Sequence, residues 1–315
     1  MTEFTLQGRK VWVAGHRGMA GGAIVRRLER EGCRIITANR AELDLLRQAD
    51  VEEWMAEKKL DAIFLAAATV GGILANSERP AEFLYDNLVI ATNVIHSAWR
   101  TGVKKLLFLG SSCIFPREAP QPMTEDMLLT GPLELTNEWY AVAKIAGIKL
   151  CQSYRRQYGC NFVSVMPTNL YGPGDRYDLQ NGHVVAALIM KIHSAKIEGR
   201  DSIELWGTGT PKREFLYSED LADACVFVMK TYSGEGFLNI GTGKEMTIRE
   251  LAELVARVAG WEGQLVLNTS RPDGVMRKVL DVSRLAALGW TAPTAIEDGM
   301  RHAYEWYVDN VAAAG

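Results

Sequence analysis

Apolar runs alternate with amphipathic segments through the first half of the chain. The runs predict buried strands at residues 10–14, 34–38, 61–67, 105–110 and 162–166. Between them, apolar positions recur at helical spacing over about 19–30, 80–99 and 137–158. Strands that are apolar throughout are typical of parallel sheets covered by helices on both faces. The pattern therefore predicts an α/β fold with a doubly wound parallel sheet and right-handed crossovers.

The pattern changes beyond Pro167. Residues 171–175 form a turn cluster rich in glycine and proline, and irregular segments become more frequent. Short strands are expected at 203–206 and 236–240, among helices near 184–196, 218–230, 247–259 and 295–308. We expect residues 1–170 to form one domain, to which later segments return. Residues 171–315 should form mainly a smaller mixed α/β domain.

Composition and charge narrow the class of protein. The chain has 315 residues, of which 48% are hydrophobic and 23% charged, as is typical of soluble globular enzymes. A net charge of −3 without a polybasic run argues against a nucleic-acid partner. No apolar stretch approaches the roughly 20 residues that cross a bilayer, and residues 1–5 lack the features of a signal peptide. We expect a cytoplasmic protein without membrane or nucleic-acid partners.

The cysteine pattern agrees with a reducing compartment. The cysteines are Cys33, Cys113, Cys151, Cys160 and Cys225. They are odd in number and irregular in spacing, and no Cys-x-x-Cys pair is present. We therefore expect reduced thiols, with neither a disulfide framework nor a metal site.

A glycine-rich loop follows the first predicted strand. Gly15, Gly18 and Gly21 form a G-x-x-G-x-x-G sequence between a strand and a helix. Such glycines let the backbone turn tightly and approach a pyrophosphate at the helix N-terminus. A plain turn is the simpler interpretation, but strand, loop and helix all lie where dinucleotide binding requires them. A mononucleotide loop would end in Lys-Ser or Lys-Thr, which is absent here. The sequence therefore predicts a Rossmann-type domain over residues 1–170.

The end of the second predicted strand indicates which dinucleotide binds. An acidic residue there would bind the ribose of NAD, whereas an arginine accommodates the additional phosphate of NADP. This chain has Ala38-Asn39-Arg40 and no acid before Glu42, and Arg17 adds a second positive group in the glycine loop. Each arginine alone would be an ordinary surface charge. Together they favour NADP(H).

Tyr140 and Lys144 lie four residues apart in a predicted helix and so share one face. A lysine ammonium beside a tyrosine favours the phenolate, which would make the hydroxyl a usable acid or base near neutrality. Ser111 follows the fourth predicted strand, at the sheet edge where open α/β sheets bind ligands. Ser111 would bind a substrate carbonyl oxygen, and Tyr140 would protonate that oxygen as hydride arrives. Lys144 would tune the tyrosine and hold the nicotinamide ribose.

Cys113 and His183 are further candidates. If the fourth strand continued past Gly110, Ser111 and Cys113 would point to the same side. Cys113 is then either an inert buried thiol or a base that removes a proton beside the polarised carbonyl. His183 is either a helix-start residue without chemistry or the acid on the opposite face of the substrate.

Six blocks of the sequence carry a resemblance to a known family: residues 14–19, 66–73, 107–116, 140–149, 166–173 and 206–215. They resemble the GDP-L-fucose synthase family of extended short-chain dehydrogenases/reductases. The Gly-Ser-Ser-Cys and Val-Gly-Gly-Ile sequences within them separate this family from generic sugar-nucleotide epimerases. The family is also called GDP-4-keto-6-deoxy-D-mannose 3,5-epimerase-4-reductase. The resemblance covers about residues 9–310.

The resemblance implies one site that epimerises C3 and C5 of a GDP-sugar and then reduces C4 with NADPH. Both carbons flank the C4 ketone, so a single oxyanion-stabilising set can serve every step. Cys113 matches the family's base and His183 its acid. Ser111, Tyr140 and Lys144 match the reductase residues.

The resemblance also implies binding residues. For NADP(H) they are Gly15, His16, Arg17, Gly18, Met19, Ala20, Gly21, Arg40, Leu109, Gly110, Ser111, Ser112, Lys144, Pro167, Thr168, Asn169, Leu170 and His183. For the GDP-sugar they are Lys191, Trp206, Arg213, Asn268 and Asp273, with Asn268 standing where an aspartate is expected. Members of the family are homodimers that pair through two helices, here residues 80–99 and 137–158.

Other functions are compatible with parts of this pattern. A GDP-L-colitose synthase would epimerise only C5 of a 3-deoxy substrate with the same residues. A 4-epimerase or 4,6-dehydratase of the same superfamily would retain and recycle NAD. A non-enzymatic NADPH sensor is disfavoured, because Ser111, Tyr140 and Lys144 are all present.

Overall fold

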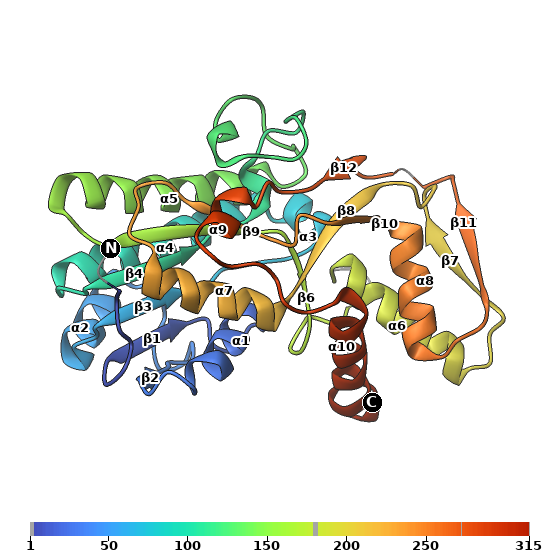
Figure 1. The fold of residues 1–315 in the computed structure, drawn as a ribbon, viewed down its shortest axis with the longest axis horizontal. Helices are drawn as coiled ribbons and strands as arrows, with labels where there is room; N and C mark the ends of the chain where they lie inside the picture. The colour runs from blue at the N-terminus through green and yellow to red at the C-terminus, as the bar shows by residue number, and fades with distance from the viewer. Residues whose placement is uncertain (1–2, 179–181, 272, 315) are drawn as a thin grey trace.

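The computed structural model describes residues 3–178, 182–271 and 273–314. Within these residues the main sheet has six parallel strands in the order β2-β1-β3-β4-β5-β9 (Figure 1). They are β1 (Lys10–Ala14), β2 (Arg34–Ile36), β3 (Ala62–Leu65), β4 (Lys105–Leu109), β5 (Phe162–Pro167) and β9 (Leu238–Ile240). The strand order reverses direction at β1, whose neighbours on its two sides are β2 and β3. Open α/β sheets bind ligands at such a point.

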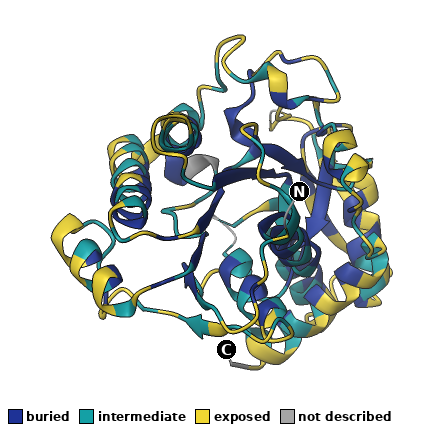
Figure 2. Cartoon of the chain, turned by 60° about the vertical axis from the view of Figure 1, so that its left-hand side comes forward, coloured by how far each residue is buried: buried dark blue, intermediate teal, exposed yellow. Residues whose placement is uncertain are grey.

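Helices cover both faces of this sheet. They are α1 (Met19–Leu28), α2 (Gln48–Lys58), α4 (Pro80–Arg100), α5 (Glu138–Tyr158), α7 (Ser218–Thr231) and α9 (Ser283–Ala287). Trp12 faces a core formed with α2, α4 and α5, whereas Val11 and Val13 face a core formed with α1, α7 and α9. Figure 2 shows the strands buried along their length, with exposed residues on the outer sides of the helices. The predicted doubly wound parallel sheet is confirmed.

A smaller part of the molecule is built mainly from later residues and lies at the right of Figure 1. Two sheets contribute to it: β7 with β11, and β8 with β6, β10 and β12. These strands are β6 (Asn169–Tyr171), β7 (Ser202–Trp206), β8 (Lys212–Tyr217), β10 (Glu245–Thr247), β11 (Gln264–Asn268) and β12 (Arg277–Lys278). The helices α6 (Val184–Ile197), α8 (Ile248–Ala259) and α10 (Ile296–Asn310) share a separate apolar core with them.

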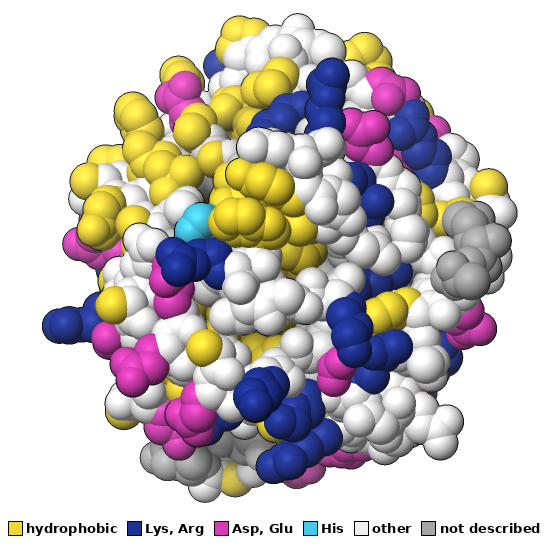
Figure 3. Space-filling view, turned by 90° about the vertical axis from the view of Figure 1, so that its left-hand side faces the viewer, with side chains coloured by type: hydrophobic (Ala, Val, Ile, Leu, Met, Phe, Trp, Pro, Cys, Tyr) yellow, Lys and Arg dark blue, Asp and Glu magenta, His cyan; other side chains and the backbone are white. Residues whose placement is uncertain are grey.

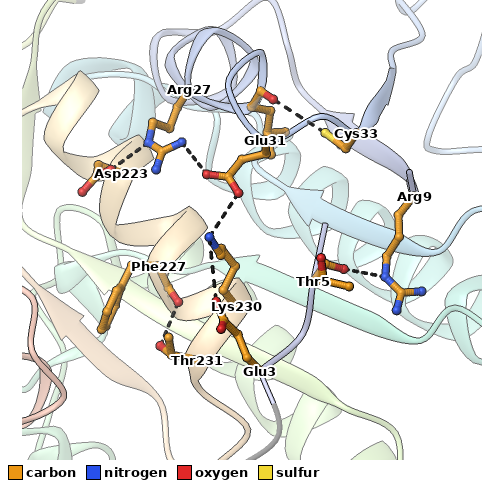
Figure 4. Close-up of polar contacts among 11 residues, drawn as sticks. Glu3, Thr5, Arg9, Arg27, Glu31, Cys33, Asp223, Phe227, Lys230 and Thr231 are labelled. Carbon is orange, nitrogen blue, oxygen red and sulfur yellow. Dashed lines mark hydrogen bonds and ion pairs between the residues drawn. The ribbon is translucent and has the colours of Figure 1, made fainter. Parts of the chain in front are cut away.

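Later parts of the chain also return to the main sheet. The strand β9 pairs with β5, and α7 packs along α1. Figure 4 shows ion pairs that join these segments: Arg27 on α1 binds Asp223 on α7 at 2.7 Å, and Lys230 on α7 binds Glu31 at 3.2 Å. The apolar contacts between α1 and α7 supply most of the stabilisation, because partly exposed ion pairs contribute roughly 0–1 kcal/mol each.

The strand and helix pattern predicted the elements of the main sheet with small differences at their ends. The second strand is shorter than predicted, because it ends at Ile36. The sequence analysis did not predict α2, α3 (Ile73–Glu78), α9, β6, β8, β10, β11 or β12. No helix within the described residues is long and apolar enough to cross a membrane.

Candidate active site

A large cleft lies at the carboxyl ends of β1, β3, β4 and β5 and extends toward α6 and β7. Its volume is about 1710 Å³. A site for one drug-sized ligand usually has about 300–1,000 Å³, so this cleft has room for a dinucleotide and a second ligand. The lining includes all five predicted catalytic residues and every predicted cofactor residue. The structure therefore brings together residues that the sequence separates by more than a hundred positions.

The glycine loop lies at one end of the cleft. Close backbone contacts explain why glycines are needed at particular positions of this loop. Gly15 has a φ of 88°, and a β-carbon there would lie 2.6 Å from the backbone nitrogen of Ala67. A β-carbon at Gly21 would lie 2.1 Å from the carbonyl oxygen of Gly15. Gly18 precedes α1 and supplies no side-chain cap, so the first amides of that helix stay free for an anion. The loop fits the pyrophosphate of a dinucleotide.

The segment after β2 contributes Ala38, Asn39 and Arg40 to the lining of the cleft, as does Arg17 of the glycine loop. The nearest acid, Glu42, turns back and accepts a hydrogen bond from the backbone N–H of Asn39 at 2.8 Å. The Asn39 side chain in turn accepts hydrogen bonds from the amides of residues 41 and 42. Glu42 is therefore occupied within the turn, whereas Arg17, Arg40 and Asp44 all line the cleft.

Ser111 and Cys113 are positioned by a turn, because β4 does not continue past Gly110. The strand ends at Leu109, and residues 112–114 form a short 3-10 helix. The Ser111 hydroxyl accepts a hydrogen bond from the backbone N–H of Cys113 at 3.5 Å and so caps this helix. The turn, rather than strand alternation, brings both side chains to the cleft.

Tyr140 and Lys144 lie on α5, which packs against the end of β4. The Lys144 ammonium donates a hydrogen bond to the carbonyl oxygen of Leu109 at 2.8 Å, and it lies 5.6 Å from the centre of the Tyr140 ring. Burial lowers the pKa of Lys144 to about 8, against the opposing effect of a Cys113 thiolate. The lysine is therefore held between the strand end and the tyrosine.

The effect of Lys144 on the pKa of Tyr140 stays a prediction, and the influences that act on this phenol in the structure are burial and Cys113. Burial, together with the charge of a Cys113 thiolate, raises the pKa of Tyr140 above its ordinary value. The phenol is removed from water, and this desolvation is the larger of the two causes. Tyr140 therefore keeps its proton across the neutral range, as a proton donor must.

The environment of Cys113 contains a cation that the sequence analysis missed. Burial raises the pKa of the Cys113 thiol, while the charge of Lys278, the hydrogen bond with Ser111 and the charge of Lys144 oppose this effect. Lys278 lies on β12 and lines the cleft. The local sequence does not identify Lys278 as a cleft residue, because β12 has only two residues and follows an irregular segment.

His183 precedes α6 and lines the cleft. A carboxylate that the sequence analysis also missed, Asp175, lines the same cavity. Burial raises the pKa of Asp175, and the positive charge of His183 opposes this shift. Between them, the backbone N–H of Gly182 donates to the carbonyl oxygen of Asp178 at 2.8 Å. In the sequence, Asp175 could have been singled out only by its position at the end of the turn cluster at residues 171–175.

At the other end of the cleft, the ring of Trp206 lies close to two cationic side chains. Trp206 has 56% of its surface exposed, with Lys191 and Arg271 each 5.0 Å from the ring centre. Lys191 and Trp206 line the cleft. Such a ring suits a planar base, and the cations suit phosphate oxygens. The sequence analysis did not single out Arg271.

Three predicted substrate residues, Arg213, Asn268 and Asp273, are absent from the described lining of the cleft. Asp273 accepts hydrogen bonds from the backbone N–H and the hydroxyl of Thr208 at 2.9 and 2.7 Å. Asn268 accepts two from Ser270 and pairs with Trp206 in the β7–β11 register. Asn268 and Asp273 therefore shape the loops beside Trp206, and a direct contact of any of the three with substrate stays a prediction.

Comparison with known proteins gives a consistent result. Residues 11–241 match the model of the NAD dependent epimerase/dehydratase family. A GDP-L-fucose synthase of Sinorhizobium fredii is 56% identical, with 99% of each chain covered. A GDP-L-fucose synthase of Escherichia coli is 48% identical, with 96% of this chain and 97% of that protein covered. A GDP-L-fucose synthetase structure from Naegleria fowleri, bound to NADP, has a TM-score of 0.91 at 26% identity and covers 99% of this chain and 98% of that one.

Proposed function

The chain belongs to the NAD dependent epimerase/dehydratase family and, within it, to the GDP-L-fucose synthases; from this premise we propose that it converts GDP-4-keto-6-deoxy-D-mannose to GDP-L-fucose with NADPH as the reductant. The observation that carries the proposal is the single cleft in which Ser111, Cys113, Tyr140, Lys144 and His183 meet the glycine loop. Full-length similarity to GDP-L-fucose synthases favours this reaction over that of a GDP-L-colitose synthase.

The glycine loop, Arg17 and Arg40 would hold NADP(H) by its pyrophosphate and its additional phosphate. Lys144, anchored on the Leu109 carbonyl, would bind the nicotinamide ribose. When bound, NADPH supplies the hydride that reduces C4 of the sugar. At the opposite end, Trp206 with Lys191 and Arg271 would bind the GDP portion of the substrate.

In the epimerisation steps, Cys113 removes a proton from the carbon next to the C4 ketone. Negative charge then develops on the ketone oxygen, where the hydroxyl groups of Ser111 and Tyr140 donate hydrogen bonds. His183 returns a proton to the opposite face of that carbon, which inverts it. The cations Lys278 and Lys144 favour the thiolate that this sequence of steps needs, and so they offset the burial of Cys113.

In the reduction step, the same oxygen receives a proton from Tyr140 as hydride arrives at C4. The raised pKa of Tyr140 keeps the phenol protonated until that oxygen becomes basic. Lys144 compensates the negative charge that remains on the tyrosine oxygen. One set of donors thereby serves both chemistries, because each of them places negative charge on the C4 oxygen.

The test of this function is incubation of the purified protein with GDP-4-keto-6-deoxy-D-mannose and NADPH. We expect stoichiometric NADPH oxidation and a product with the L-galacto configuration of fucose by NMR. A D-configured product, or catalysis by tightly bound NAD without consumption of NADPH, would contradict the proposal. The second result would support a 4-epimerase or 4,6-dehydratase, and absence of turnover with any keto-sugar nucleotide would support an NADPH sensor.

Arg40→Asp is expected to shift cofactor preference from NADPH toward NADH. The substitution places a carboxylate where the additional phosphate of NADP would bind, and repulsion replaces attraction. The ratio of kcat/KM for NADPH to that for NADH should fall by about a hundredfold, which corresponds to roughly 2.7 kcal/mol. Arg47→Asp is the matched control, because Arg47 is exposed and lies outside the described cleft lining. An unchanged ratio in the Arg40 variant would remove the support for this phosphate site.

We further propose that the protein is a cytoplasmic homodimer that pairs through α4 and α5. Several apolar side chains on or next to these helices are exposed: Tyr85, Leu135, Trp139, Val142 and Tyr158. The rings of Trp99 and Tyr158 stack with their centres 4.5 Å apart. Figure 3 views the end of the molecule that is at the left of Figure 1, where apolar side chains gather beside a histidine.

The free thiols of all five cysteines support a reducing compartment.

Val142→Glu is expected to convert a dimer into monomers. The valine is 39% exposed on α5, and a carboxylate at this position in a paired interface would lose its hydration. Sedimentation should show twice the chain mass of 34.9 kDa for the wild type and one chain mass for the variant. Val266→Glu, the same change on β11, should leave the mass of the assembly unchanged. A wild type that sediments as a monomer would contradict the pairing.

A further inference from the structure

The strand β12 brings Lys278 to the cleft, but this strand is too short to fix its own position. Its two residues, Arg277 and Lys278, pair with Lys212 and Arg213 at the edge of β8 (Figure 1). Strands in globular proteins usually have about 3–10 residues, and two residue pairs supply few backbone hydrogen bonds. The position of Lys278 therefore depends on contacts made by the residues that follow it.

The residues after β12 are fastened on one side to the segment that follows Cys113. The backbone N–H of Met123 donates a hydrogen bond to the carbonyl oxygen of Val279 at 2.9 Å. Leu280 is buried in the same apolar core as Cys113 and Met123. Lys278 and Cys113 both line the cleft. A displacement of this segment would therefore move Lys278 relative to the thiol.

On its other side, the same segment is held by a buried carboxylate on β8, that of Glu214. Its Oε2 atom accepts a hydrogen bond from the backbone N–H of Leu280 at 2.8 Å. Its Oε1 atom accepts hydrogen bonds from the backbone N–H groups of Thr242 and Gly243 at 2.6 and 2.8 Å. Glu214 has no exposed surface, and a β-carbon at Gly241 would overlap its carboxylate. Glu214 therefore ties the end of β12 to the turn between β9 and β10.

The charge that β12 carries acts on the proposed base. Burial raises the pKa of the Cys113 thiol, and the charge of Lys278 is the first of the influences that oppose this rise. The other charged or titratable groups that act on Cys113 or Lys278 come from α5, β8 and the loop before α5: Lys144, Tyr140, Arg213 and Glu134. The fraction of thiolate at a given pH therefore depends on where β12 holds Lys278.

We propose that Glu214 is a positioning residue that holds Lys278 beside the Cys113 thiol and so controls the reactivity of the base. The inference rests on the proposed function, in which Cys113 removes a proton from the sugar. Glu214 is absent from the described lining of the cleft. It acts through the amide of Leu280, two residues from Lys278, rather than on the substrate.

Glu214→Gln breaks this tie on the side of β12. The glutamine oxygen can keep the two donors of the β9–β10 turn, but the amide nitrogen then faces the N–H of Leu280, donor against donor. The variant also removes a negative charge, which by itself would favour the Cys113 thiolate. Withdrawal of Lys278 has the opposite effect. A rise in the pKa of Cys113 therefore distinguishes positioning from a direct effect of charge.

The experiment follows alkylation of Cys113 by iodoacetamide as a function of pH, with peptide mass spectrometry on the whole protein. Only the thiolate reacts, so the rate reports its fraction. In Glu214→Gln the rise of the rate with pH should be displaced by about one pH unit toward alkaline pH, which lowers the rate at neutral pH about tenfold. The profile of Cys160 in the same samples should not move.

Asp220→Asn is the matched control for the loss of a buried carboxylate. Asp220 on α7 is also buried, and it accepts a hydrogen bond from the backbone N–H of Thr294 at 3.1 Å. It is absent from the described lining of the cleft and makes no recorded bond to β12 or the residues after it. The Cys113 profile of this variant should equal that of the wild type.

Lys278→Met completes a double-mutant cycle. It should displace the Cys113 profile in the same direction, and Glu214→Gln in the same chain should move the profile no further. If the glutamine variant does not fold, Glu214→Asp provides the same readout, because a carboxylate one methylene shorter cannot reach the donors on both sides.

The assignment is overturned by a folded Glu214 variant whose Cys113 profile is unchanged or moves toward lower pH. It is also overturned by an equal displacement in Asp220→Asn, by an unchanged profile in Lys278→Met, or by a Glu214→Gln displacement that persists in full without Lys278. A failure of the proposed function is distinct, because alkylation requires no sugar. In that case the wild type would neither oxidise NADPH nor exchange deuterium with the keto-sugar, whatever the Cys113 profiles show.

Discussion

Tyr140→Phe should lower the rate of NADPH oxidation with the keto-sugar by about 10²–10⁴-fold, because it removes only the proton donor to the C4 oxygen. Tyr140 lies in the cleft with Lys144 behind it, and burial raises the pKa of its phenol. The phenylalanine ring keeps the packing against Phe83. The loss should therefore fall on kcat, with the Kd for NADPH and the melting temperature nearly unchanged.

The matched control for this variant lies on the same helix. Tyr158→Phe removes a phenol hydroxyl that accepts a hydrogen bond from the Gln157 side chain at 2.9 Å. Its turnover should equal that of the wild type. If Tyr140→Phe also kept wild-type turnover, Tyr140 would not be the acid, and the protonation of the C4 oxygen would need another donor from the cleft.

Cys113→Ser should slow the exchange of solvent deuterium into C3 and C5 of the 4-keto sugar by at least about a hundredfold. A serine hydroxyl is a far weaker base than a thiolate at neutral pH. The measurement is mass spectrometry in heavy water with NADP⁺ present, so that reduction does not occur. The variant should still bind NADPH and slowly reduce the unepimerised ketone to a D-configured product, since Ser111, Tyr140 and Lys144 are intact.

The pH dependence of this exchange provides an internal check. Burial raises the pKa of Cys113, and only the thiolate form can accept a proton. In the wild type the exchange rate should therefore rise with pH through the neutral and mildly alkaline range, and this rise should vanish in Cys113→Ser. His183→Asn should slow the inversion yet retain some exchange through the thiolate.

Cys160→Ser is the control for thiol chemistry elsewhere in the chain. Cys160 is a half-buried free cysteine outside the described lining of the cleft. Its replacement should leave exchange unchanged. Full exchange in the Cys113 variant would mean that another group removes the proton, and Cys113 would then serve only packing.

The sequence by itself determined the features that depend on local periodicity and steric demand. Apolar runs gave the positions of β1, β3, β4 and β5, because a strand buried on both faces must be apolar throughout. The spacing of Gly15 and Gly21 follows from backbone contacts within one turn and with the adjoining strand. Tyr140 and Lys144 share a helix face because they are four residues apart, whatever the rest of the fold does.

Only the tertiary structure decided which distant residues meet and how their environments act on them. Ser111 and Cys113 reach the cleft through a 3-10 turn that strand alternation does not predict. Lys278 faces Cys113 because a two-residue strand pairs with β8, and such a short segment has no periodicity to read. The pKa of Tyr140 rises mainly because its phenol is buried, and burial depends on the packing of the whole molecule. The type of each side chain is fixed by the sequence. Its desolvation and its contacts with distant residues arise only when the chain folds.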